Sequence, residues 1–238
     1  MPHPANWPEM TPEQRRTWRL EVFSKSGESV KFVSPKAKKN YEIRVKRMID
    51  VYNLRKPDRV PLNLNAGNLP LTMAGLNAWT AFYEPQKAYE AAMKFNEKYS
   101  DELESYSMPM AMSGEALELL DYKLYAWPGH KLPKEAPGWQ FIEGEYMPPE
   151  EYDDLIRDPS DFWLRKYLPR VFGAFEPFRM FQPFTNITEN VHVGGLMPLA
   201  APPVQEMLKR LLKVGEAFQK NAMGMFAFMG RGAAWGFP

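Results

Sequence analysis

The stretch KPDRVPLNLNAGN at positions 56–68 decides the predicted fold. Between its opening turn residues and the closing Ala66-Gly67-Asn68, apolar residues alternate with proline and asparagine: Val60, Leu62 and Leu64 against Pro61, Asn63 and Asn65. This period of two is typical of a β-strand with two unlike faces. Pro61 has no backbone N–H, which favours an early or edge position in a sheet. The stretch therefore predicts a strand over 60–65 that ends in a turn.

Helical patterns flank this predicted strand. Thr11-Pro12-Glu13-Gln14 has the form of a capping box, and Ser34-Pro35 begins a second helix with an apolar stripe: Tyr41, Val45, Met48, Ile49 and Tyr52. The charged side chains of this second helix, Arg47 among them, lie largely off the stripe and are expected to face solvent. Further helices are predicted over 85–99 and 114–120 and from 149 and 202 onward, and further strands over 106–112 and 123–127. Strands that alternate with helices predict an α/β fold with parallel strands.

The composition indicates a globular chain and excludes several kinds of function. Of 238 residues, 45% are hydrophobic, while 30 Lys and Arg face 29 Asp and Glu, which gives a net charge of +1. A charge this close to zero disfavours nucleic-acid binding. The chain has no cysteine, which excludes disulfides, thiolate metal ligands and a cysteine nucleophile within it. No signal-like segment and no apolar run of about 20 residues is found, so we expect a cytoplasmic protein that does not enter a membrane.

Two parts of the sequence resemble a known superfamily. RKPDRVP at 55–61 resembles the opening of uroporphyrinogen decarboxylase-like proteins, in which a helix leads through a similar turn into the first barrel strand. The more distinctive likeness, to an uncharacterised branch related to corrinoid methyltransferases, lies in EGEYM at 143–147, EYD at 151–153, DPSDFWL at 158–164 and YLPR at 167–170. Together the likeness covers roughly residues 48–238.

The resemblance implies an α/β fold, namely a (β/α)₈ TIM barrel whose active site lies at the carboxyl ends of the strands. We expect residues 1–54 to form an N-terminal helical extension and residues 55–238 to form a partial barrel domain. A barrel of this type takes about 250 residues, and only three or four strands are recognisable here. The resemblance therefore predicts the N-terminal portion of an incomplete barrel.

Two chemistries are known in that superfamily: decarboxylation of uroporphyrinogen without a cofactor, and methyl transfer among a methyl donor, a corrinoid and a thiol acceptor, often with zinc. In the decarboxylases the first strand runs into Met-Arg-Gln-Ala-Gly-Arg, and its arginines hold the carboxylates of the substrate. Aligned on Ala66-Gly67, this chain has Leu64 and Asn68 at those positions. Because asparagine cannot replace a bidentate cation, the resemblance favours methyl transfer.

Three functions therefore stay open. The first is methyl transfer in one-carbon metabolism, with a corrinoid protein or a small methyl donor as partner. Tetrapyrrole decarboxylation in porphyrin biosynthesis is the second, and a non-catalytic fragment or binding module is the third. No cofactor is assigned within the chain; a partner-bound corrinoid and zinc are implied only by the resemblance, and a homo-oligomer remains open.

The candidate catalytic residues are His130, Glu145 and Tyr146. His130 follows the strand predicted over 123–127, and catalytic groups gather at strand ends in a barrel. Glu145 and Tyr146 belong to an acidic and aromatic loop segment and could supply an acid or base and a hydrogen-bond donor. A solvated loop is the alternative interpretation for both.

The candidate substrate-binding residues are Asn63, Asn65, Asn68 and His192. Asn63 and Asn65 share one face of the predicted strand at 60–65, which would point into the barrel near its mouth. Hydrogen bonds to loop backbone are the alternative. No residue is assigned to a metal.

Overall fold

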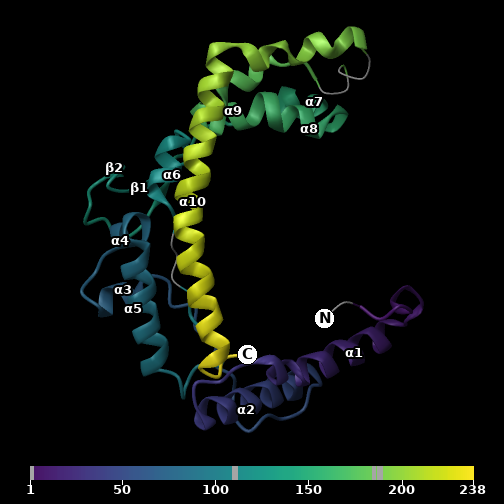
Figure 1. Cartoon of the computed structure of the whole chain (residues 1–238), viewed down its shortest axis with the longest axis vertical. Helices are drawn as coiled ribbons and strands as arrows, with labels where there is room; N and C mark the ends of the chain where they lie inside the picture. Colours follow the sequence, from purple (N-terminus) through teal and green to yellow (C-terminus); the bar gives the residue numbers. More distant parts are fainter. Residues whose placement is uncertain (1–2, 109–111, 184–185, 187–189) are drawn as a thin grey trace. The chain divides into compact units, whose positions relative to one another are not determined.

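The computed structural model describes residues 3–108, 112–183, 186 and 190–238. It has a mixed α/β fold in which helices predominate and one small three-stranded sheet is present (Figure 1). The chain divides into two compact units. Unit 1 comprises residues 1–70, 89–109 and 224–238, and unit 2 comprises residues 71–88 and 110–223.

Unit 1 begins with the two helices expected from their N-terminal sequences. In α1 (Pro12–Ser24) the Thr11 side chain accepts from the Gln14 N–H, and the Gln14 side chain accepts from the Thr11 N–H, so the capping box is confirmed. Ser34 caps α2 (Pro35–Tyr52) by accepting from the Ala37 N–H at 3.1 Å. α1 contacts α2, and two 3₁₀ turns, η1 (Trp7–Glu9) and η2 (Ser26–Ser29), precede and follow α1.

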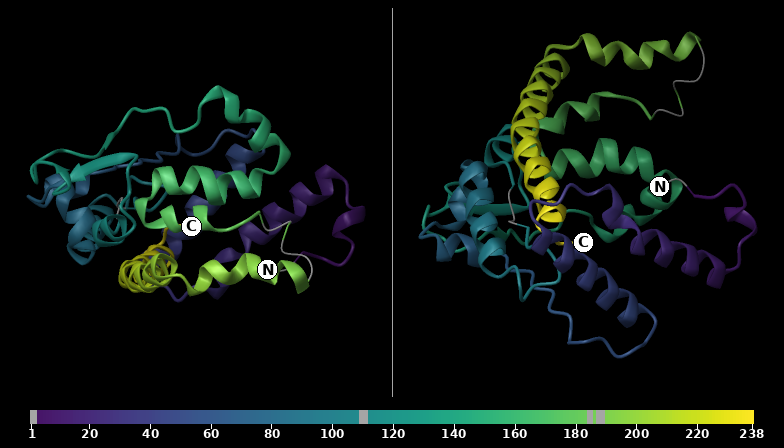
Figure 2. Two further views of the ribbon diagram at one scale, coloured as in Figure 1. Left: turned by 90° about the horizontal axis from the view of Figure 1, so that it is seen from above. Right: turned by 60° about the horizontal axis from the view of Figure 1, so that its bottom comes forward.

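Three helices contribute residues to both units: α3 (Leu69–Met73), α5 (Pro85–Lys98) and α10 (Pro202–Ala234). α5 was predicted close to these bounds, and the start of α10 was predicted at residue 202. In the right-hand view of Figure 2, α10 is one unbroken helix.

The core of unit 1 gathers aromatic side chains from α5, the segment after it and the end of the chain. Phe95, Leu103 and Phe237 are buried together, and Tyr106 packs against them with its ring 5.2 Å from that of Phe237. Gly236 lies at φ 95°, where a side chain would collide with the backbone of α2. A glycine is therefore required for the chain to deliver Phe237 into this core.

Unit 2 contains the small sheet and a series of short helices. Its elements are α4 (Ala78–Tyr83), α6 (Gly114–Leu119), β1 (Tyr125–Pro128), β2 (Lys131–Leu132), β3 (Gln140–Phe141), η3 (Pro149–Glu151), α7 (Tyr152–Arg157), α8 (Pro159–Asp161), η4 (Phe162–Tyr167), α9 (Leu168–Val171), η5 (Gly173–Met180) and η7 (Asn190–Ala200). The Asp158 side chain caps α8 by accepting from the Asp161 N–H, as its position before Pro159 predicts. The π-helix η4 lies between α8 and α9.

The sheet has the strand order β2-β1-β3. β1 pairs antiparallel with β3, with Tyr125 opposite Phe141, and pairs with the two residues of β2 in parallel register. The strand expected over 123–127 is thus confirmed as β1. Trp127 of this strand is buried with Phe82 and Leu117, and Ala116, Leu120, Val214 and Ala217 form a second buried cluster of this unit.

The strand expected over 60–65 is wrong. These residues form no helix and belong to no sheet, and Val60 is 84% exposed. A strand needs a neighbour with matching N–H and C=O groups, and here the Leu62 carbonyl accepts a single bond from the Glu104 N–H at 3.0 Å. The strand expected over 106–112 is likewise absent at residues 106–108 and 112, and residues 109–111 lie outside the described part of the chain.

The expectation that Arg47 faces solvent is also wrong, because its side chain is only 6% exposed. It lies among carboxylates of other segments and so needs no water to satisfy its charge. None of the helices within the described residues combines the length and the apolar character needed to cross a membrane.

Candidate functional site

Two polar clusters, one in each unit, hold chemically competent side chains. The His130 cluster of unit 2 consists of His130, Trp127, Tyr83 and Glu118. His130 enters it through a tight turn after β1, in which Trp127 and His130 exchange backbone hydrogen bonds of 3.0 and 2.8 Å. The turn depends on Gly129, which has φ 87° and no room for a side chain beside Trp79. It lays the imidazole flat on the Trp127 indole, with ring centroids 4.2 Å apart and an interplanar angle of 15°.

Glu118, on α6, links the imidazole to a tyrosine. Its Oε1 lies 4.0 Å from His130 Nδ1 and accepts a 2.5 Å hydrogen bond from the Tyr83 hydroxyl. Trp127 Nε1 donates to the same hydroxyl at 3.1 Å. Burial and the hydrogen bond to Glu118 raise the pKa of Tyr83 to about 12. Tyr83 is therefore a fixed donor at neutral pH, which orients the carboxylate toward His130.

This arrangement can perform general acid–base chemistry. The His130 side chain is 31% exposed and so remains accessible. A carboxylate beside an imidazole stabilises the charged ring once it takes up a proton. The sequence pattern indicated His130 but neither Glu118 nor Tyr83. Tyr83 lies 35 residues from Glu118, and no local pattern joins them.

The other predicted catalytic residues do not join this cluster through any contact within the described chain. The Tyr146 hydroxyl donates to the Ile142 carbonyl at 2.9 Å, and the Tyr146 carbonyl accepts from Arg170 Nη1 at 2.9 Å. Glu145 is exposed. Their catalytic roles stay predictions, while the contacts observed serve the local loop.

The predicted substrate-binding residues are spread over both units. Asn63 and Asn65 are exposed in the 60–65 segment of unit 1, and Asn68 is partly buried after it. His192 belongs to η7 of unit 2, and its side chain lies outside the described part of the structure. No contact within the described residues brings these four together.

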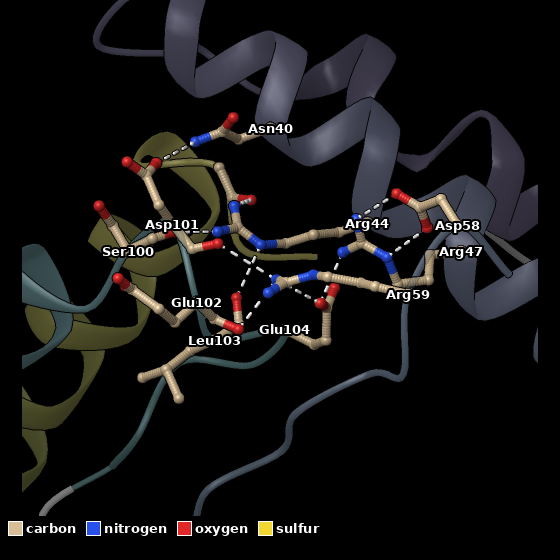
Figure 3. Close-up of polar contacts among 11 residues, drawn as sticks. Asn40, Arg44, Arg47, Asp58, Arg59, Ser100, Asp101, Glu102, Leu103 and Glu104 are labelled. Carbon is tan, nitrogen blue, oxygen red and sulfur yellow. Dashed lines mark hydrogen bonds and ion pairs between the residues drawn. The ribbon is translucent and has the colours of Figure 1, made fainter.

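The second cluster, the arginine cluster of unit 1, was missed by the sequence analysis. It consists of Arg44 and Arg47 from α2, Asp58 and Arg59 from the turn before the 60–65 segment, and Glu104 after α5 (Figure 3). Asp58 and Arg59 belong to the RKPDRVP stretch that carries the first resemblance.

Arg47 forms the centre of the ion pairs. Its Nε and Nη2 donate to the two oxygens of Asp58 at 2.6 and 2.7 Å, and its Nη1 donates to Glu104 Oε1 at 2.5 Å. Arg59 Nη2 donates to the same Glu104 oxygen at 2.7 Å. The hydrogen bonds from Arg47 lower the pKa of Asp58 to about 2, and those bonds raise the pKa of Arg47 above its ordinary value. Glu104 Oε2 is buried without a hydrogen-bond partner among the described residues.

Arg44 is buried but pairs with no carboxylate within the described chain. Its guanidinium donates to three backbone carbonyls, those of Leu103 at 2.9 Å, Gly236 at 2.5 Å and Ser100. The guanidinium carbon also lies 4.6 Å from the centre of the Phe237 ring. Burial lowers the pKa of Arg44, and the neighbouring charges of Arg59 and Arg47 lower it further.

Two surface hollows lie in unit 1. A cleft of about 250 Å³ is lined by Asn40, Ile43, Arg44, Arg47, Asp58, Arg59 and Asp101. A wider groove of about 740 Å³ lies between η2 and α2. The charges on its rim pair with one another: Lys38 with Glu42, and Lys46 and Arg55 with Asp50. Three of the seven residues that line the cleft are arginines, whereas the groove is lined by one arginine, Arg55.

The described residues contain no group of three or more His, Cys, Asp or Glu side chains placed to hold a metal ion. The zinc that the resemblance implies therefore finds no matching ligand set in this part of the chain. Comparison with family models, curated proteins and solved structures finds no match to the chain.

Proposed function

We propose that the chain carries part of a uroporphyrinogen decarboxylase-like barrel and acts in corrinoid-dependent methyl transfer in one-carbon metabolism. The stretches at 55–61 and 143–170 support the family. The choice of methyl transfer over decarboxylation rests on one observation, the way in which the chain uses its arginines.

A polycarboxylate such as uroporphyrinogen needs guanidinium groups that are free to hold it. Unit 2, which carries His130, has five arginines, and four of them are held by acids of the chain: Arg157 by Asp154, Arg165 by Asp161, Arg170 by Glu151 and Arg179 by Glu176. Leu64 and Asn68 stand where the decarboxylases have their motif arginines. A substrate with little negative charge fits unit 2 and these two positions better.

His130 would act as the base of this reaction. A thiol acceptor loses its proton as the new carbon–sulfur bond forms, and a neutral imidazole can accept that proton. The Glu118 carboxylate lies 4.0 Å from Nδ1 of this imidazole. The corrinoid, when bound on its partner, supplies the methyl group.

The experiment follows the absorbance of methylcobalamin in the presence of a small thiol and the full chain. We expect demethylation to fall about 100-fold in His130→Gln, the usual contribution of a positioned acid or base. His3→Gln is the matched control, because His3 also stacks on an indole, that of Trp7, at 4.1 Å, but lies in unit 1.

Parallel assays distinguish the alternatives. If uroporphyrinogen loses carboxyl groups in the presence of the chain while methylcobalamin stays intact, decarboxylation replaces the proposal. If neither reaction occurs with the folded protein, the chain is a binding module or fragment and the catalytic proposal fails.

A further inference from the structure

The cleft of the arginine cluster carries more positive than negative charge. Arg44, Arg47 and Arg59 reach it from two segments, and Lys36 lies beside it, paired with Asp101 at 3.0 Å. Three carboxylates oppose these four cations: Asp58, Asp101 and Glu104. The cleft is therefore a place where one further anion would be stabilised.

The three guanidiniums differ in how fully they are engaged. A guanidinium has five N–H donors. Arg59 donates only through Nη2, so its Nε and Nη1 make no hydrogen bond within the described chain. Arg44 is held by carbonyls alone, so its charge has no carboxylate in contact among the described residues. Among the described residues, the cleft therefore has N–H donors on Arg59 without an acceptor and a positive charge on Arg44 without a contacting carboxylate.

Asp58 is the acidic group on the cleft rim that covers an arginine, whereas Asp101 pairs with Lys36. Glu104 is 1% exposed and holds Arg47 and Arg59 together, so it cannot leave without disrupting the unit. Asp58 is 57% exposed and lies on the cleft rim, where it covers the Nε–Nη2 edge of Arg47. That edge has the fork geometry that binds carboxylates and phosphates. Asp58 therefore occupies the position that an anion from solution would take.

We propose that this cleft binds a small oxyanion of the phosphate class, which displaces Asp58 from Arg47 and also contacts Arg59. A tetrahedral dianion can accept from several guanidiniums at once, whereas the single carboxylate of Asp58 satisfies only one guanidinium edge. Asn40, whose amide donates to Asp101 at 3.2 Å, stands on the same cleft as a further donor. The site is independent of His130 and of the proposed methyl transfer.

The test titrates the full chain with inorganic phosphate at constant ionic strength, by calorimetry, with glycerol phosphate as a monoester arm. Wild-type protein should bind saturably but weakly, because Asp58 competes. Asp58→Asn should bind about tenfold more tightly, since one charge-assisted competitor is gone, and Arg59→Gln about tenfold more weakly. Asp50→Asn is the matched control, because Asp50 pairs with Arg55 at the other groove of this unit.

The sign of the Asp58→Asn effect decides the proposal. Tighter binding in Asp58→Asn together with unchanged binding in Asp50→Asn supports it, and binding of glycerol phosphate as well as phosphate identifies a monoester site. An equal gain in phosphate affinity in both variants would show a general effect of removing a negative charge and would overturn the proposal. Absence of saturable binding in both wild type and Asp58→Asn, or unchanged binding in a folded Arg59→Gln, would also overturn it. Should Arg59→Gln fail to fold, the two aspartate variants still decide.

Discussion

The His130 cluster and the arginine cluster each contain one central glutamate, but the two glutamates differ in solvent exposure and in the partners of their carboxylates. Glu118 keeps 44% of its side chain exposed and accepts one hydrogen bond, from a neutral tyrosine. Glu104 keeps only 1% of its side chain exposed, and its carboxylate contacts two guanidinium groups. An exposed carboxylate retains its hydration, whereas a buried one needs ionic partners. The comparison indicates that Glu104 maintains the fold of its unit and that Glu118 is available for chemistry.

The largest effect is expected from Glu104→Gln. Removing the buried negative charge leaves Arg47 and Arg59 facing each other across a neutral side chain. Breaking a buried pair from one side typically lowers the free energy of unfolding by about 3–5 kcal/mol. Urea unfolding followed by circular dichroism measures this loss.

Glu102→Gln is the control for that variant, because Glu102 is exposed two residues away and its side chain makes no hydrogen bond within the described residues. It should change stability by no more than about 0.5 kcal/mol. Equal losses in the two variants would mean that the ion pairs of Glu104 contribute nothing beyond a generic charge change.

A smaller effect is expected from Tyr83→Phe in the His130 cluster. The change removes the donor to Glu118 and leaves Trp127 Nε1, on a fully buried indole, without its acceptor. An unsatisfied buried donor costs about 1–3 kcal/mol. Tyr125→Phe, in the same unit, is the control, because the Tyr125 hydroxyl makes no hydrogen bond within the described chain. If both substitutions lower the free energy of unfolding equally, the hydrogen bonds of the Tyr83 hydroxyl do not stabilise the fold.

Local sequence signals predicted where several helices begin, but α3 and α4 were not predicted. The capping box at Thr11 and Gln14, the cap at Ser34 and the proline starts of α5 and α10 each act within one helical turn. β1 was found for a similar reason, since the predicted strand runs directly into Pro128 and a glycine turn. His130 was identified because it follows that strand.

The failures at 60–65 and at Arg47 depend on partners outside the local segment. Alternation over 60–65 describes a strand only if another strand lies beside it, and the sequence around Val60 says nothing of that neighbour. Arg47 lies off the apolar stripe of α2, yet it is buried because Asp58, 11 residues away, and Glu104, 57 residues away, meet it there. A charged residue off the stripe can be interpreted as buried only once its distant counter-charges are known.

The smallest effect is expected from protonation of Asp58. Its pKa falls from 3.8 to about 2 because Arg47 donates two hydrogen bonds to the carboxylate. A group with a lowered pKa in the folded state binds fewer protons there than in the unfolded chain. Its stabilising contribution is therefore complete above about pH 4 and is lost as the pH falls toward about 2.

The matching measurement is the urea midpoint of wild type and Asp58→Asn between about pH 5 and pH 2.5. We expect the wild type to be more stable at the upper end and the difference to shrink at the lower end. The other acids with lowered pKa values, such as Asp101 and Glu151, are common to both proteins, so their effects cancel in the difference. Because Asp58 is more than half exposed, solvent screens the pair and the difference should be small. A difference that stays constant with pH would mean that the charge of Asp58 does not stabilise the fold through Arg47. In its contribution to stability, the carboxylate at the rim of the arginine cluster would then resemble the half-exposed Glu118 of the His130 cluster more than the buried Glu104.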